Sequence, residues 1–130
     1  MAQDIQHIRI VDLLDEETSP SGHGALYNVV FQLSSDPPMQ WVEIFENEWL
    51  HVWYSMKREV RIYGDRLEVH APLGEIDSYH LPQLRAVFDK VNEKFKSHIA
   101  QAEAARARED EESARRRAEV AALKGSIKFD

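Results

Sequence analysis

Apolar and polar residues alternate along two stretches near the start of the chain. Residues 5–14 (IQHIRIVDLL) alternate and are rich in β-branched side chains, which predicts a strand. Residues 26–34 (LYNVVFQLS) alternate more regularly, so that one face of the predicted strand would carry Tyr27, Val29, Phe31 and Leu33 and the other Asn28, Val30 and Gln32. The Ser, Pro and Gly residues of 15–24 (DEETSPSGHG) indicate a loop between them. We therefore expect two antiparallel strands.

The spacing changes to that of a helix after residue 36. Large apolar side chains recur three and four residues apart, at Trp41, Ile44, Phe45 and Trp49. Asp36 is predicted to cap the free N–H groups at the start of this helix, with Pro37 in the first helical position. The amphipathic pattern ends near His51.

A hairpin is predicted over residues 59–71 (EVRIYGDRLEVHA). Apolar residues alternate with charges on both sides of Gly64-Asp65, and this dipeptide suits a type I′ or II′ turn because glycine accepts a positive φ. The last predicted element is a helix over 82–124, from Pro82 to the helix stop expected at Gly125. Its first part carries an apolar stripe consisting of Leu84, Val87, Phe88, Val91, Phe95 and Ile99.

The order of elements is strand, strand, helix, strand, strand, helix. It predicts an α+β fold with one four-stranded antiparallel sheet (ββαββα order), helices on one face and a long projecting C-terminal helix. The helix over 82–124 would measure about 65 Å at about 1.5 Å per residue, whereas a body of this size is about 30 Å across. We therefore expect a compact α+β domain at 1–99 that folds alone. We also expect a projecting charged helix at 100–124, continuous with the last helix of the domain, and a short tail at 125–130 that forms a strand or a loose end.

The projecting part is rich in Ala, Glu and Arg, and its alanines follow a 4–3 spacing. The seam consists of Ala100, Ala104, Ala107, Ala114, Ala118 and Ala121, interrupted by Glu111. Two interpretations stay open, because alanine is also simply a good helix former. As a helix–helix contact, the seam predicts a weak antiparallel homodimer, a coiled coil with Arg115–Arg117 of one chain near Glu109–Glu112 of the other, or binding to a partner helix.

Composition and charge limit which classes of protein this chain can belong to. The chain has 130 residues, 43% of them hydrophobic, and no cysteine, which excludes disulfides and thiolate metal sites. The start lacks the pattern of a signal peptide and no segment resembles a membrane span, so we expect a cytoplasmic protein, bacterial in style, without membrane contact. Residues 1–80 hold 5 Lys/Arg and 14 Asp/Glu, a net charge of −9, while residues 81–130 hold 11 and 9, a net charge of +2. This acidic body disfavours nucleic-acid binding.

No pattern of residues predicts a reaction. The histidines His7, His23, His51, His70, His80 and His98 do not stand at metal-binding spacings. The acidic cluster Asp12, Asp15, Glu16 and Glu17 lacks the pattern of an EF-hand, and neither a nucleophile elbow nor a phosphate-binding loop is present. We accordingly assign no catalytic, cofactor-binding or metal-binding residue, and no cofactor.

An aromatic stretch follows the first predicted helix. Trp41 and Trp49 have core spacing, whereas Trp53, Tyr54 and Met56 lie in a less regular segment and are of types enriched at interfaces. Two interpretations stay open for Trp53 and Tyr54, a place in the core and a place at an interface. The candidate interface residues are therefore Trp53, Tyr54 and Met56 in the body, and Ala104, Ala107, Ala114 and Ala118 in the helix.

We expect a non-enzymatic protein–protein interaction or adaptor module that acts through the α+β body and the long C-terminal helix. One alternative is a small enzyme with a site near the 19–24 loop and the hairpin histidines, using His23, His70 or His80 with an acidic residue. Another is a domain that senses a small ligand in an apolar pocket behind Trp53 and Tyr54.

Overall fold

One antiparallel sheet forms the centre of the fold, in a computed structural model that describes residues 7–129. Its strands are β1 (Ile10–Leu13), β2 (Ser19–Pro20), β3 (Leu26–Leu33), β4 (Glu59–Tyr63) and β5 (Arg66–Pro72). The sheet order is β1-β3-β5-β4, and β2 also pairs with β3. The helices are α1 (Met39–His51), a 3₁₀ turn (Leu73–Glu75), a π-helical turn (Ile76–His80) and α2 (Leu81–Ser126). The predicted α+β class is confirmed, with one strand more than expected.

The extra strand lies in the segment that was predicted to be only a loop. Ser19 pairs with Asn28 and Pro20 with Tyr27 on β3. Thr18 precedes this strand and is held by two hydrogen bonds. Its hydroxyl donates to the carbonyl of Leu14 and accepts the N–H of Val30 on β3, both at 3.0 Å. Proline is acceptable here because β2 lies at an edge of the sheet.

The first strand is shorter than predicted. Of the predicted strand over 5–14, the structure has a strand only at Ile10–Leu13, with a register shift between Ile10 and Asp12, and residues 5 and 6 lie outside the described residues. Ile8 is fully buried but bonds to a side chain instead of a neighbouring strand. Its N–H donates to Oδ1 of Asn92 and its carbonyl accepts from Nδ2, both at 2.9 Å. Residues 7–9, which the alternating pattern assigns to the strand, therefore form an anchored segment instead.

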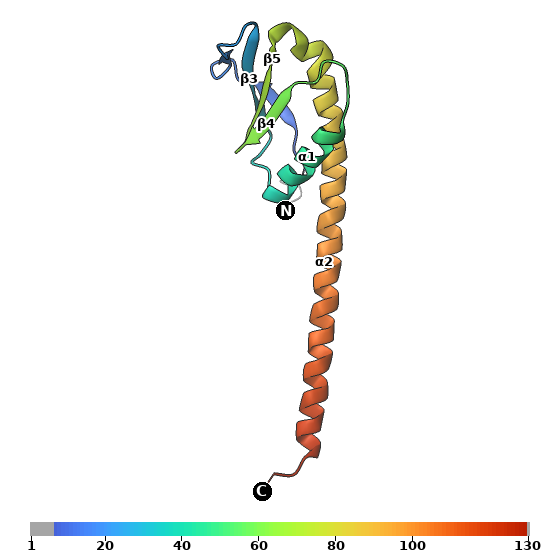
Figure 1. Cartoon of the computed structure of the whole chain (residues 1–130). Coiled ribbons are helices and arrows are strands. Elements are labelled where there is room, and N and C mark those ends of the chain that lie inside the picture. The colour runs from blue at the N-terminus through green and yellow to red at the C-terminus, as the bar shows by residue number, and fades with distance from the viewer. Residues whose placement is uncertain (1–6, 130) are drawn as a thin grey trace. The chain divides into compact units, whose positions relative to one another are not determined.

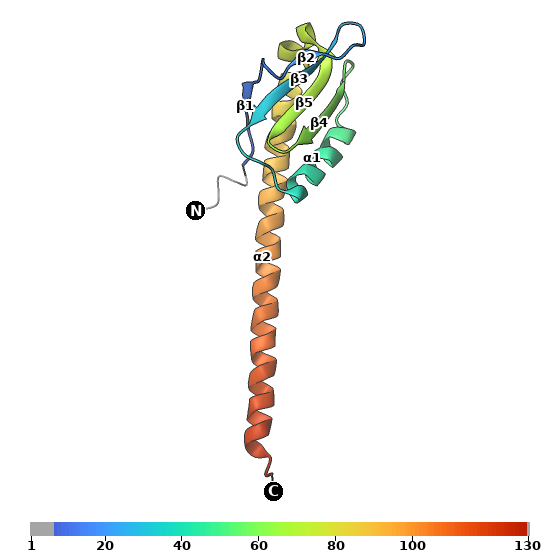
Figure 2. The ribbon, with the colours of Figure 1, turned by 90° about the vertical axis from the view of Figure 1, so that its left-hand side faces the viewer.

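The two faces of the sheet differ as the alternation predicts. Val29 pairs with Val69 and Phe31 with Leu67, and all four are buried. Figures 1 and 2 show α1 and the beginning of α2 on the same side of the sheet. The polar residues between the buried ones, such as Glu68 and His70, therefore point to the other face.

Aromatic rings connect the two helices. The Phe88 ring of α2 lies edge-on to Trp41 and Phe45 of α1, with centroids 5.0 and 5.5 Å apart. Trp41, Phe45 and Trp49 are all buried, as their helical spacing predicts. The predicted cap of α1 is wrong, because the helix begins at Met39 with Pro38 as its N-cap and no side-chain cap bond. The Pro37-Pro38 pair delays the start, since the residue before a proline avoids helical dihedrals.

The hairpin agrees with its prediction, and Gly64 has a φ of +56°. Asp65 does not have a positive φ, which excludes the type I′ alternative. The last helix begins one residue earlier than predicted, at Leu81, and continues through Gly125 to Ser126. Ile127–Phe129 belong to no strand.

Residue contacts divide the chain into two units, Met1–Lys96 and Ser97–Asp130. Helix α2 contributes its first turns to the first unit and most of the second. Among residues 7–129, no helix combines the length and the apolar character needed to cross a membrane.

Candidate functional site

The three body residues of the candidate interface differ in their exposure. Trp53 has 83% of its surface exposed, whereas Tyr54 and Met56 are half-buried. Leu50, at the last turn of α1, is also exposed, at 73%. Two exposed apolar side chains thus stand three residues apart, Leu50 in the last turn of α1 and Trp53 in the segment that joins α1 to β4.

A chain of hydrogen bonds holds Tyr54 in place. Its hydroxyl lies 2.7 Å from Nδ1 of His80, and Nε2 of His80 lies 2.9 Å from Oε1 of Glu75. Arg58 binds both oxygens of the same carboxylate, at 3.0 and 2.9 Å. This Tyr54–His80–Glu75–Arg58 network joins the segment after α1 to the turns before α2. His80 is 1% exposed, which makes it one of the most buried polar residues.

The charges of this network determine where its protons lie. Hydrogen bonds from Arg58, then from His80, lower the pKa of Glu75 to about 2. The ionised carboxylate can only accept, so Nε2 of His80 carries the ring proton, and in the neutral ring Nδ1 accepts from Tyr54. Burial, reinforced by the negative charge of Glu75, raises the pKa of Tyr54 to about 12. A tyrosine with a raised pKa keeps its proton, so Tyr54 acts as the hydrogen-bond donor at its end of the network.

Lys57 fixes the same segment against the end of α1. Its Nζ donates to the carbonyl of Val52 at 2.7 Å and to that of Trp49, and it lies 5.2 Å from the centroid of the Trp49 ring. An ammonium group at a helix C-terminus binds free carbonyls and favours the helix dipole. Trp53 is thus displayed from a segment anchored on both sides of it, which lowers the entropy cost of binding through its indole.

The histidines of the enzyme alternative occupy separate places. His70 is on β5, paired with Asn28, on the sheet face away from the helices. His80 is buried in the π-helical turn, and His23 is exposed between Gly22 and Gly24. Among the described residues, no group of three His, Asp or Glu side chains is placed to hold a metal ion.

The open face of the sheet has a shallow hollow of about 350 Å³ beside His70. It is lined by Asn28, Glu59, Val60, Arg61, Glu68 and His70. Arg61 and Glu68 form an ion pair at 2.7 Å across it, and Nε2 of His70 is buried and has no hydrogen-bond partner among residues 7–129. Tyr54, behind which the ligand-sensing alternative expects an apolar pocket, packs edge-on to Trp49, with the ring centroids 6.0 Å apart.

The four alanines of the candidate interface lie on the part of α2 beyond Lys96. From 97 to 129 every described residue is exposed except Ile99 and Ser113, which are half-buried. The 30 helical residues 97–126 measure about 45 Å, so the length of helix without a packing partner is considerable. Glu112 and Arg116, four residues apart on this helix, form an ion pair at 3.7 Å.

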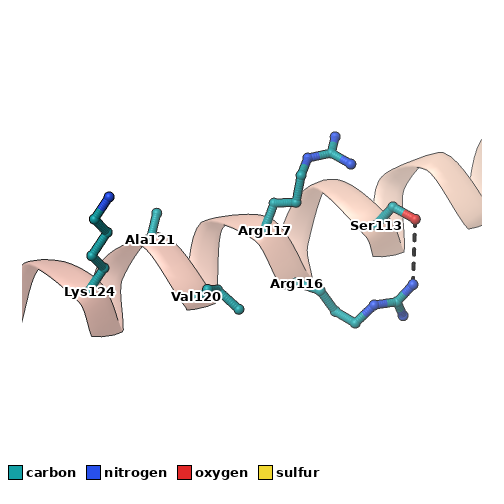
Figure 3. Close-up of a pocket in the computed structure, with 6 residues that line it drawn as sticks. All are labelled: Ser113, Arg116, Arg117, Val120, Ala121 and Lys124. Atoms are coloured by element: carbon teal, nitrogen blue, oxygen red, sulfur yellow. Dashed lines mark hydrogen bonds between the residues drawn. The ribbon is translucent and has the colours of Figure 1, made fainter.

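Figure 3 shows a hollow on this helix and the six residues that line it, Ser113, Arg116, Arg117, Val120, Ala121 and Lys124. Arg116 turns back toward the Ser113 hydroxyl at 3.4 Å, while Arg117 extends from the other side. All six residues come from one helix, so no second element closes the hollow.

Sequence reasoning missed the Tyr54–His80–Glu75–Arg58 network. Its members lie up to 26 residues apart, at no recognisable spacing. The one usable signal was the run from Pro72 to Pro82, which is too irregular for a strand and holds both Glu75 and His80. Comparisons with protein-family models, with curated proteins and with solved structures found no match for this chain.

Proposed function

We propose that this chain is a non-enzymatic protein–protein interaction module whose helix over 97–126 binds another helix. The exposure of that helix carries the proposal. Exposed helices of isolated peptides are marginal in water, and most helices in proteins are stabilised by packing one face. A helix with no buried residue over eight turns gains that packing by binding a partner.

The body supplies a second surface, centred on Trp53. Exposed tryptophans are frequent among the residues that dominate binding energies, and the anchored segment presents this indole without further ordering. Leu50 extends the surface along α1. An adaptor that joins two partners, one at the helix and one at the body, is consistent with these separate surfaces.

The test compares two variants of the full chain that differ only in the face that is changed. Ala107→Arg places a large charged side chain on the alanine seam, and Ala105→Arg places it on the opposite face. Each purified chain is analysed by sedimentation and used as bait in an extract of its native host. We expect wild type and Ala105→Arg to retain the same association, and Ala107→Arg to lose it while its circular dichroism stays unchanged.

The body surface is tested with Trp53→Ala in the same experiments. Association that survives Ala107→Arg but is lost in Trp53→Ala would show that the partner binds the body at Trp53 and not the helix. The proposal for the helix would be refuted if the wild-type protein does not self-associate and retains no protein that Ala107→Arg loses.

A further inference from the structure

We infer that the partner of the helix over 97–126 is a second copy of the same helix, antiparallel, with the two-fold axis between residues 112 and 113. This inference rests on the proposed function and specifies its partner. The seam of small residues alone would not identify a partner. Charge complementarity along its flanks, together with the exposure of the whole segment, identifies one.

The seam is symmetric about its centre. In an antiparallel pair, facing residues have numbers with a constant sum, and pairing Ala104 with Ala121 also pairs Ala107 with Ala118. The same register brings Ala100 opposite Gly125, which is helical in the structure although the sequence suggested a helix stop there. Small side chains thus face each other in every layer but the central one, which lets the two helices approach closely.

The central layer determines the direction of pairing. Glu111 occupies a seam position, and in a parallel pair aligned in register it would face Glu111 of the second copy. Two carboxylates with little water between them repel strongly. In the antiparallel pair Glu111 faces Ala114 instead, and the flank beside it carries Arg108 and Arg115 of both copies, so that each carboxylate has arginines next to it although these arginines also face one another.

The opposite flank of the antiparallel pair carries two pairs of oppositely charged residues. Asp110 lies next to Arg117 of the second copy, and Glu103 lies next to Lys124. Symmetry makes each match occur twice. On this flank the charges favour a second copy of this helix, because Glu103 and Asp110 supply negative charge where Lys124 and Arg117 of the second copy supply positive charge.

The geometry is tested by cross-linking, which is clean here because the chain has no cysteine of its own. Ala104→Cys and Ala121→Cys chains are mixed in equal amounts and oxidised gently at a concentration where sedimentation detects dimer. We expect a disulfide-linked dimer from the mixture and none from either chain alone, since seam residues of a close pair meet the distance that a disulfide needs. Cross-linking of Ala104→Cys alone would show a parallel pair and overturn the inference.

The charges are tested by reversal. Asp110→Arg should raise the dimer dissociation constant about tenfold, because two attractive contacts become repulsive. Adding Arg117→Asp to the same chain restores both contacts with reversed signs and should return the constant to within about threefold of wild type. A double variant as weak as the single one would refute the register.

The outcomes separate this inference from the proposed function. Wild-type chain that stays monomeric at millimolar concentration overturns self-pairing. If such a chain still retains a protein that Ala107→Arg loses, the proposed function survives with a different partner. If it retains none, both fail.

Discussion

Asn92 is the polar residue whose replacement we expect to destabilise the body most clearly. It is 5% exposed and lies on α2, where its side chain makes three hydrogen bonds. Two bind the backbone of Ile8, at 2.9 Å each, and the third accepts Nε1–H of Trp41 at 2.8 Å. Ile8 and Trp41 are themselves fully buried, so water cannot replace Asn92 without opening the core.

The expected magnitude follows from these three bonds. Asn92→Ala leaves three buried polar groups without partners, and each such loss costs about 1 kcal/mol or somewhat more. We expect the free energy of unfolding to fall by about 3 kcal/mol, a large part of the roughly 5–15 kcal/mol typical of a domain. For a unit of this size the midpoint of thermal unfolding should fall by about 12–20 °C.

The assay is urea unfolding followed by tryptophan fluorescence, with Glu93→Ala as the control. Glu93 is the next residue on α2 and is exposed, so its replacement should change stability by less than about 0.5 kcal/mol. Trp41→Phe removes one of the three groups that bond to Asn92, and in combination with Asn92→Ala it should cost about 1 kcal/mol less than the sum of the single changes. A loss for Asn92→Ala no larger than that of the control would refute the reasoning.

Three further predictions concern the rest of the chain. The lowered pKa of Glu75 means that this carboxylate stabilises the fold at pH values above about 4.5 and that its contribution is lost as the pH falls toward about 2. In Glu75→Gln, the free energy of unfolding should therefore depend less on pH between about 4.5 and about 2. Gly64→Ala should lower the free energy of unfolding by about 1–2 kcal/mol through the positive φ alone, because nothing lies within 4 Å of an added Cβ. The control Gly74→Ala is equally unobstructed and has no positive φ, so its free energy of unfolding in urea should be close to that of wild type. A chain truncated before residue 103 should keep a cooperative unfolding transition within about 1 kcal/mol of wild type, and an aggregated product would contradict this.

The elements predicted correctly from the sequence are those whose pattern is local. The hairpin around Gly64 combines alternation with a turn that only a few residue types accept, and both signals lie within thirteen residues. The core side of α1 was predicted for the same reason, because Trp41, Phe45 and Trp49 repeat at the period of a helix.

The errors occur where distant residues decide the structure. Residues before Ile10 alternate as a strand would, yet Ile8 is bound by a side chain 84 residues away. Ser19-Pro20 becomes a strand only because β3 offers an edge beside it. The Tyr54–His80–Glu75–Arg58 network likewise joins two connecting segments that no spacing rule relates.

The candidate site was predictable to a different extent in its two parts. The alanine seam is a periodic pattern, and the sequence indicates both the helix and the face. The role of Tyr54 was open between core and interface, and its bond to His80 places it with the structural network, whereas the adjacent Trp53 remains exposed. Sequence alone could not separate these neighbours, because the partner of Tyr54 lies 26 residues further along the chain.

The two units also differ in what stabilises them, and this difference determines how mutations should act. In the first unit, α2 is tied to the rest by Asn92 and by Glu48, which pairs with Lys94. Beyond Lys96 the helix depends on the propensities of Ala, Glu and Arg and on weak pairs such as Glu112–Arg116. Substitutions on the alanine seam should therefore change association without changing the stability of the body, whereas Asn92→Ala should change stability and leave the seam intact.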